Sequence, residues 1–429
     1  MTGPKADFSA GYVRRVVDTE LDDLIDELPA LWLDGPKAVG KTATASQRAA
    51  TIRRLDRPAV RQIAESDAAL ALAGQPPVLL DEWQRLPAVW DAVKAAVDAD
   101  TSPGQFLLTG SAASGTHSGA GRIKAVRMRP LTLPERGVAS PTVSVQDLLS
   151  GERIAVDGES DLNLADYVDL ILGSGFPAFQ RLTGRSLRAQ LDGYLDRIVD
   201  VDLEESGLRV RRPATVRAWL RAFAAATATS ASWEKIRAAA TPGSDLKPAR
   251  STVIPYVDAL TRLRIVDDIE AWVPGHGHLR RLSQAPKHHL ADPALAARLV
   301  GVSRSDLLDG RAGSVEFQRD GTFLGALFES LCALSLRVLA QHCEASIWHL
   351  RIDNGRHEVD FVLERDDGRV VAVEAKLSPN VSDRDVRHLR WLGDQIGDRL
   401  LDAVVLTTGE RAYRRADGVA VVPLALLGP

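Results

Sequence analysis

The sequence predicts a multidomain α/β protein in which a parallel-sheet domain comes first, a helical region follows and a second α/β domain ends the chain. Three observations predict this. Short apolar segments alternate with helical patterns up to about residue 136, helical periodicity alone fills residues 164–228, and strand-like segments return after a long helical stretch. A length of 429 residues suits two to four domains.

The first domain is expected over residues 1–137. Helical patterns are expected at 11–28, at about 41–49, before Gly74 and through Trp90 to Val97. Strands are expected at 30–33, 51–55, 78–80 and 106–108. Strands that alternate with helices form a parallel sheet covered on both faces, so we expect that architecture here.

The rest of the chain divides where the pattern changes. Residues 138–163 are mixed polar without periodicity and are interpreted as a linker. Residues 164–275 are predicted to be helical, and they end in a short helix, a second helix entered by Pro248 and a hairpin at 265–273. Residues 276–429 are predicted to hold a long helix from about 313 to 341 and then strands at 347–351, 358–363, 370–376 and 403–406.

The composition excludes several classes of protein. A formal charge of −4 and a pI of about 6.2 leave no overall attraction to nucleic acid, so any DNA-binding surface has to be a local patch. The two cysteines, Cys332 and Cys343, give neither a disulfide framework nor a zinc spacing and are interpreted as packing residues. We see no signal peptide and no run of about 18 apolar residues, so a cytoplasmic protein without a membrane partner is expected.

A complete phosphate-binding motif follows the first predicted strand. The pattern G-x-x-x-x-G-K-[ST] is matched by Gly35, Pro36, Lys37, Ala38, Val39, Gly40, Lys41 and Thr42. The glycines let backbone N–H groups face the phosphates of ATP, Lys41 would reach the β- and γ-phosphates, and Thr42 would hold Mg²⁺. The alternative is a plain strand-to-helix turn. ATP and Mg²⁺ are therefore the expected ligands.

Two carboxylates end the third predicted strand of this domain. Asp81 is placed to hold Mg²⁺ through water, and Glu82 to polarise the attacking water as a general base. Thr109, at the end of the next strand, could contact the γ-phosphate or serve only a turn. Such an acidic pair is a weak signal by itself, but it gains weight after a phosphate-binding loop.

This region resembles the AAA-type P-loop ATPases, in particular a bacterial and archaeal subgroup. The resemblance rests on residues 35–42, on Leu80-Asp81-Glu82-Trp83-Gln84-Arg85-Leu86-Pro87 and on Phe106-Leu107-Leu108-Thr109-Gly110-Ser111-Ala112. It implies a P-loop NTPase fold. In the subgroup a small-residue stretch ending in Gly-Arg follows, which makes Arg122 a candidate phosphate-sensing or finger arginine; a solvated surface arginine is the alternative. A second copy of the chain is kept open as a partner.

Carboxylates and a lysine gather on a hairpin expected near the C-terminus. If Gly368 ends a three-residue loop, Arg365 opposes Arg369 and Asp360 opposes Glu374. Because strand residues alternate faces, Glu358, Asp360, Glu374 and Lys376 then share one face. The other face would carry Val359, Phe361, Leu363, Val371, Val373 and Ala375.

Two close carboxylates beside a lysine are the groups that a Mg²⁺-dependent phosphodiesterase needs. The pattern of Asp360, Glu374 and Lys376 resembles the PD-(D/E)XK nuclease core, in which an acidic residue of a preceding helix completes the metal site; Glu329 is the matching position. The alternative is a solvated, salt-bridged hairpin. The subgroup named above carries such a nuclease-like domain at its C-terminus, and Gly173-Ser174-Gly175-Phe176-Pro177, Pro286-Lys287 and Ala291-Asp292 resemble its motifs.

The middle of the chain resembles a winged helix-turn-helix. Lys247, Arg250 and Arg262 could meet DNA phosphates, and Ser251 and Thr252 could approach base edges. Basic helix pairs are common, so DNA contact is left open. His288, His289 and Asp292 are not expected to share a metal ion, because adjacent strand residues point to opposite faces.

The leading functional hypothesis is ATP hydrolysis coupled to conformational change, with DNA as an open partner. The rival hypothesis is a nucleotide-gated regulatory or scaffold protein whose nuclease-like domain is catalytically inactive. Turnover of ATP would distinguish them.

Overall fold

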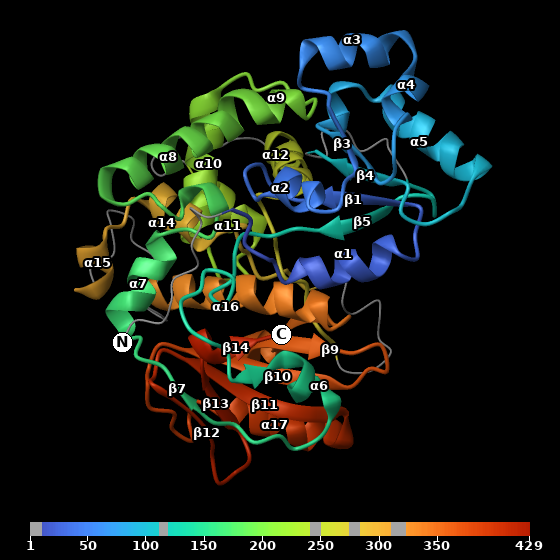
Figure 1. The fold of residues 1–429 in the computed structure, drawn as a ribbon. Coiled ribbons are helices and arrows are strands. Elements are labelled where there is room, and N and C mark those ends of the chain that lie inside the picture. The colour runs from blue at the N-terminus through green and yellow to red at the C-terminus, as the bar shows by residue number, and fades with distance from the viewer. Residues whose placement is uncertain (1–10, 111–118, 241–249, 274–283, 310–322) are drawn as a thin grey trace.

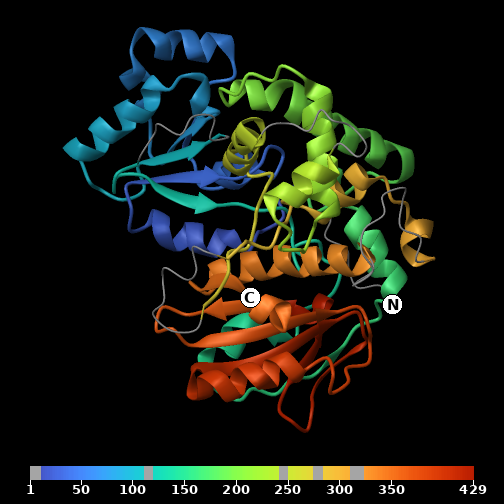
Figure 2. The same ribbon diagram turned by 180° about the vertical axis from the view of Figure 1, so that it is seen from behind.

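The structure, a computed structural model, describes residues 11–110, 119–240, 250–273, 284–309 and 323–429. An N-terminal α/β domain and a helical domain lie side by side on one long helix, α16 (Phe323–His342), and a second sheet lies on the other side of that helix (Figures 1 and 2).

The N-terminal domain is built on a five-stranded sheet of order β2-β3-β4-β1-β5, in which all neighbours are parallel. Its strands are β1 (Ala30–Asp34), β2 (Thr51–Arg54), β3 (Val78–Asp81), β4 (Phe106–Thr109) and β5 (Lys124–Arg127). Its helices are α1 (Val17–Ile25), α2 (Lys41–Ser46), α3 (Pro58–Ser66), α4 (Ala68–Leu72) and α5 (Ala88–Ala99). The prediction of a parallel α/β domain is confirmed.

Alternation along the strands explains why both faces of this sheet are covered. Leu79 of β3 and Leu107 of β4 belong to one apolar cluster, whereas Leu80 and Leu108, one residue further along, belong to another. Successive side chains of a strand point to opposite faces, so apolar residues at every position require cover on both sides. Trp83 is buried against Trp90, with ring centroids 4.6 Å apart, so it is a packing residue as expected.

The helical domain begins at α7 (Leu164–Leu172). It continues with α8 (Gly184–Arg197), the π-helical turn η3 (Ile198–Asp202), α9 (Leu203–Glu205), α10 (Pro213–Ala225), α11 (Trp233–Ala239) and α12 (Arg250–Arg262), and later α14 (Pro293–Val300) and α15 (Arg304–Leu308). Asp292 joins its early and late parts, since it accepts hydrogen bonds from Ser174 Oγ (2.9 Å) and from the N–H of Gly175 (2.5 Å). Two of the motifs that were noted far apart in the sequence thus meet.

The C-terminal sheet has seven strands in the order β7-β12-β13-β11-β10-β9-β8. The strands are β8 (Ser346–Ile352), β9 (His357–Glu364), β10 (Val370–Lys376), β11 (Leu400–Thr407), β12 (Arg411–Arg414), β13 (Ala420–Pro423) and the distant β7 (Gly158–Glu159). Helix α16 contacts β8, β9 and β10, whereas α17 (Arg387–Ile396) contacts β9, β10 and β11. The face of the sheet toward α17 has an apolar cluster of its own, whereas the face toward α16 shares its cluster with the helical domain.

The segment interpreted as a linker belongs to the C-terminal sheet, and that prediction is wrong. Strand β7 pairs with β12, and β6 (Val143–Ser144) pairs with the last strand, β14 (Leu427–Gly428). Between them, α6 (Val145–Ser150) packs on β11 and β10, as its position among the red strands in Figure 1 shows. Strands β6 and β7 have two residues each, which is too short for an alternating pattern to be visible in the sequence. Their partners lie far along the chain and give no local signal.

The hairpin expected at 265–273 is also wrong. Val266 pairs with Leu290 and Ile269 with Lys287, so the partner of this segment is the stretch at 287–290. Ala271 further pairs with His349 of β8. The segment therefore connects the helical domain to the C-terminal sheet.

Within the described residues one helix, α16, is long and apolar enough to cross a membrane, but 78% of its most apolar window is buried. Most of its apolar side chains are buried. The helix itself lies between the two upper domains and the C-terminal sheet (Figure 2). That hydropathy is what a core helix between two layers requires.

Candidate functional site

The phosphate-binding motif forms a loop between β1 and α2, as the sequence predicts. Gly40 adopts φ +102°, a conformation that favours glycine. Gly35 lies so close to β5 that a Cβ atom built on it would come 2.3 Å from the backbone oxygen of Met128. Both glycines of the motif are thus required by the backbone path that opens the loop to a ligand.

Lys41 points back into this loop. Its Nζ donates hydrogen bonds to the carbonyl oxygens of Gly35 (2.7 Å) and Pro36 (2.8 Å). Burial lowers the pKa of Lys41 to about 8, although nearby Glu82 and Asp34 oppose that shift. The carbonyl oxygens are uncharged acceptors. A phosphate that entered the loop could take their place as the partner of the Lys41 ammonium, and its negative charge would bind the ammonium more strongly.

The hydroxyl groups of Thr42 and Thr109 both contact the carboxylate of Asp81. Its Oδ1 accepts hydrogen bonds from Thr42 Oγ1 at 2.7 Å and from Thr109 Oγ1 at 2.6 Å. Asp81 and Thr109 lie opposite each other on β3 and β4, and parallel strands end at the same edge of a sheet. Hydroxyl and carboxylate oxygens are hard ligands that suit Mg²⁺, so these residues fit that ion.

Glu82 follows directly in a left-handed conformation, with φ +58°. Non-glycine residues adopt this region rarely, and such strain is concentrated at functional sites. Its Oε2 accepts a hydrogen bond from Gln84 Nε2 at 2.7 Å. The Glu82 carboxylate is close enough to Lys41 to raise the pKa of that lysine. It is held by Gln84, and this contact could not be predicted from the sequence.

Arg122 does not join this site within its own chain. It is exposed, and its Nε donates to Asp98 Oδ1 of α5 at 2.5 Å. Arg122 lies just before β5 begins, and parallel strands begin at the edge opposite the phosphate-binding loop. A sensor role toward the chain's own nucleotide is thereby corrected. Ser111, which the sequence also places after β4, lies outside the described residues.

The register predicted for the C-terminal hairpin is confirmed. Val370 pairs with Glu364 and Val373 with Phe361, and Gly368 ends the turn with φ +77°. The predicted division of faces is partly wrong, because Val359 packs with Val362 in a different cluster from Phe361. A β-bulge places Asp360 and Phe361 opposite the single residue His349, which breaks the alternation.

Asp360, Glu374 and Lys376 lie together at the end of this hairpin. Lys376 Nζ is 2.6 Å from Glu374 Oε2 and 4.0 Å from Asp360 Oδ2. Burial first, and then the charge of Asp360, raises the pKa of Glu374 well above its usual value. Glu329 approaches from α16 as expected, and burial raises its pKa to about 8.

A buried lysine from outside the hairpin stands among these carboxylates. Lys287 is 1% exposed, and its Nζ is 2.8 Å from Glu329 Oε1, 3.0 Å from Asp360 Oδ1 and 3.3 Å from Glu358 Oε1. Burial would lower the pKa of Lys287, but the three carboxylates outweigh burial and raise it well above its usual value. Within the predicted metal set of Glu329, Asp360 and Glu374, the Lys287 ammonium therefore lies between Glu329 and Asp360. The described residues contain no group of three or more His, Cys, Asp or Glu side chains placed to hold a metal ion.

Comparisons with known families match three separate parts of the chain. Residues 27–136 match the family model of an AAA domain. Together with the loop geometry, this match supports a P-loop ATPase. Residues 164–306 match a domain of unknown function (DUF8612), and residues 324–427 match another (DUF4143), so the nuclease-like fold stays a prediction.

Relatives extend over nearly the whole chain. Uncharacterized proteins of Mycobacterium tuberculosis and Mycobacterium bovis are each 24% identical over 436 aligned positions, which cover 99% of this chain and 86% of theirs. A Walker-type ATPase of Pyrococcus abyssi, whose structure is solved, is 17% identical and covers 68% of this chain and 99% of its own, with a TM-score of 0.39.

The P-loop is fastened to the helical domain by a contact that sequence reasoning missed. Lys37 Nζ is 2.7 Å from Asp202 Oδ1 and 2.8 Å from Glu205 Oε2, and the carbonyl of Lys37 accepts a hydrogen bond from Tyr194 at 3.1 Å. Asp202 ends η3, and π-helical turns occur frequently at functional sites. We call the contact of Lys37 with Asp202 and Glu205 the loop–helix latch. The acidic run from Asp200 to Glu205 was its only sequence signal.

Breaking this latch should loosen the η3–α9 segment. In Asp202→Asn we expect amide hydrogen exchange of residues 198–205 to accelerate roughly ten- to a hundredfold, because a hydrogen bond to a charged group contributes about 1.5–3 kcal/mol. Asp200→Asn is the matched control, since Asp200 lies on the same turn but pairs with Arg217. Equal exchange in the two variants would mean that the latch does not hold the segment.

A second polar network connects the P-loop to α16. Asp34, which ends β1, forms an ion pair with Arg264, whose Nη2 is 2.6 Å from Asp34 Oδ2. Arg129 and Arg337 both approach Asp267, three residues after Arg264, at 3.0 Å and 3.7 Å. Burial would raise the pKa of Asp267, but the surrounding arginines hold it far below its usual value. Charged side chains thus join the P-loop strand to the helix that supports the C-terminal sheet.

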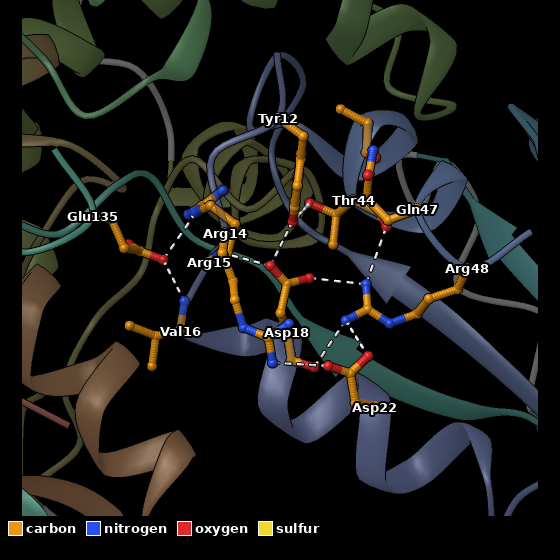
Figure 3. Close-up of polar contacts among 11 residues, drawn as sticks. Tyr12, Arg14, Arg15, Val16, Asp18, Asp22, Thr44, Gln47, Arg48 and Glu135 are labelled. Carbon is orange, nitrogen blue, oxygen red and sulfur yellow. Dashed lines mark hydrogen bonds and ion pairs between the residues drawn. The ribbon is translucent and has the colours of Figure 1, made fainter. Parts of the chain in front are cut away.

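The N-terminal segment before α1 is fixed to the helix that follows the P-loop (Figure 3). Tyr12 Oη donates to Asp18 Oδ2 at 2.7 Å or to Thr44 Oγ1 at 2.9 Å, and Arg48 Nη1 is 2.8 Å from Asp18 Oδ1. Arg15 Nε is 2.9 Å from Glu135 Oε1. Helix α2 and the turn after it are therefore tied to the segment around α1.

The DNA-contact residues are only partly described. Lys247 lies outside the described residues, and so do the side chains of Arg250, Ser251 and Thr252 at the start of α12. Arg262, at the end of α12, is half-buried. Of the histidines, His288 approaches Asp268 while His289 is buried, and the carboxylate of Asp292 is engaged by the Ser174 and Gly175 motif.

Proposed function

We propose that this protein is a Mg²⁺-dependent ATPase that couples hydrolysis to movement of the helical domain against the P-loop domain. The observation that carries the proposal is the meeting of Thr42, Asp81 and Thr109 at one sheet edge, with Lys41 and Glu82 beside them. These groups supply a cation for phosphate, oxygens for a metal ion and a carboxylate base.

Each residue has a separate part in the proposed reaction. Lys41 leaves the carbonyls of the loop and binds the β- and γ-phosphates. Thr42 and Asp81 would hold Mg²⁺, and the ion would neutralise charge on the phosphates. Glu82, once released by Gln84, accepts a proton from the attacking water, and Thr109 keeps the carboxylate of Asp81 oriented.

The coupling proposal rests on the loop–helix latch. Because Lys37 belongs to the loop that surrounds the phosphates, nucleotide binding and release act directly on its contacts with Asp202 and Glu205. In a homo-oligomer, Arg122 is free to act on the nucleotide of a neighbouring copy once its pairing with Asp98 opens. In the first proposal, the nucleotide acts on the helical domain of the same chain. In the second, it is contacted by an arginine of a neighbouring copy.

The decisive experiment is multiple-turnover ATP hydrolysis, measured with and without DNA. Release of many phosphates per chain supports an ATPase. Tight ATP binding with at most one turnover supports the rival, a nucleotide-gated regulatory or scaffold protein.

We also propose that any DNA contact is made by local charge near α12. Binding should then weaken with salt, with a slope of log K against log [salt] of about −0.9 for each phosphate contact on duplex DNA. Arg250→Glu with Arg262→Glu should weaken binding and flatten the slope, as fluorescence anisotropy would measure. Unchanged binding in this double variant would exclude the surface.

A further inference from the structure

The carboxylate cluster of the C-terminal sheet already contains a cation. Lys287, at the centre of the cluster, has an ammonium with three N–H donors. Three carboxylate oxygens, of Glu329, Asp360 and Glu358, lie 2.8–3.3 Å from its Nζ. The ammonium donates hydrogen bonds to Glu329 and Asp360 and forms an ion pair with Glu358, and the side chain is closed off from solvent.

Two further oxygens of the cluster are also engaged. Asp360 Oδ2 accepts the backbone N–H of Ala375 at 3.0 Å, and Glu374 Oε2 accepts Lys376 Nζ at 2.6 Å. A divalent cation would have to bind Glu329 and Asp360 at about 2.0–2.6 Å from their oxygens. That position coincides with the space which the Lys287 ammonium fills, so the donor set does not fit a metal ion while Lys287 is in place.

The backbone holds Lys287 in this position. Lys287 exchanges two hydrogen bonds with Ile269, of 2.8 Å and 2.9 Å. The next residue, His288, makes two more, with Ala228 and Thr229 of the helical domain. These bonds fix the backbone of Lys287, and burial among the three carboxylates holds its side chain, so the lysine is a fixed part of the site.

We propose that Lys287 is the resident cation of the C-terminal cluster and takes the place of a divalent metal ion. The cluster then fastens the helical domain to helix α16 and the C-terminal sheet, and does not cut phosphodiesters by a metal-dependent route. Glu329, Glu358 and Asp360 act as acceptors for an ammonium that comes from a different domain.

The test is Mn²⁺ binding by the full-length chain, followed by electron paramagnetic resonance without nucleotide. Every sample carries Asp81→Asn, which removes the candidate metal ligand of the P-loop. With Lys287 present, we expect no Mn²⁺ binding that depends on Asp360 and Glu374, so adding Asp360→Asn and Glu374→Gln changes nothing. In Lys287→Met we expect Mn²⁺ binding to appear, at least tenfold tighter than in the parent, and to be lost again with Asp360→Asn.

Lys376→Met is the matched control, because it removes the half-exposed lysine of the cluster and leaves Lys287 in place. It should gain no Mn²⁺ binding. Binding in the parent that Asp360→Asn with Glu374→Gln abolishes would overturn the proposal, and so would a folded Lys287→Met that gains none. If Lys287→Met does not fold, the parent comparison alone decides. A rise in melting temperature with Mn²⁺ in Lys287→Met, absent from the parent, would support it further.

Discussion

Lys41→Ala should abolish tight ATP binding, with a loss of affinity of about a hundredfold or more. The Lys41 ammonium lies inside the loop, where it would meet the β- and γ-phosphates in the proposed complex. Hydrogen bonds to charged groups contribute about 1.5–3 kcal/mol each, and two of them would be lost. Isothermal titration calorimetry with a non-hydrolysable ATP analogue and Mg²⁺ measures the effect.

Lys37→Ala is the matched control, because it removes a second lysine from the same loop with the same change of charge. Lys37 points to the helical domain, so its loss should change ATP affinity less than tenfold. If both variants lost affinity equally, net charge rather than the position of Lys41 would account for binding.

Glu82→Gln should retain ATP binding and lose turnover by about 10²- to 10⁴-fold, the contribution of a positioned general base. The amide keeps the size of the side chain but cannot accept the proton of water. Steady-state phosphate release, measured beside ATP affinity, separates the two effects.

Glu65→Gln serves as the control, since Glu65 is an exposed carboxylate of the same domain, 54% accessible, and should leave turnover unchanged. Unimpaired hydrolysis by Glu82→Gln would transfer the role of base to another group.

Contiguous patterns carried most of what the sequence could predict. The motif at residues 35–42 and the carboxylates that end β3 are each defined by neighbours in the chain. Their meeting at one sheet edge follows from the parallel order of the strands. The partner of Glu82 could not be predicted in the same way. The contact with Gln84 depends on the left-handed backbone conformation of Glu82, which no sequence pattern predicts.

The C-terminal site shows where local patterns fail. The turn at Gly368 sets the register of β9 with β10, and that register was predictable. The bulge opposite His349 was not, because it depends on how β8 pairs. Lys287 was missed as a site residue because its acceptors come from α16 and β9, and a single lysine has no periodic signal.

The pairing of β6 and β7 with the end of the chain has a consequence for synthesis. Strand β7 leaves the ribosome about 250 residues before its partner β12 is made, and β6 about 280 residues before its partner β14. At roughly 5–20 residues per second, these strands wait about 12–56 s without a sheet to join. The P-loop domain can close during that interval, but the C-terminal domain becomes complete only when the last residues emerge. A nascent chain stalled shortly before residue 427 should therefore carry a finished nucleotide site and an unfinished sheet.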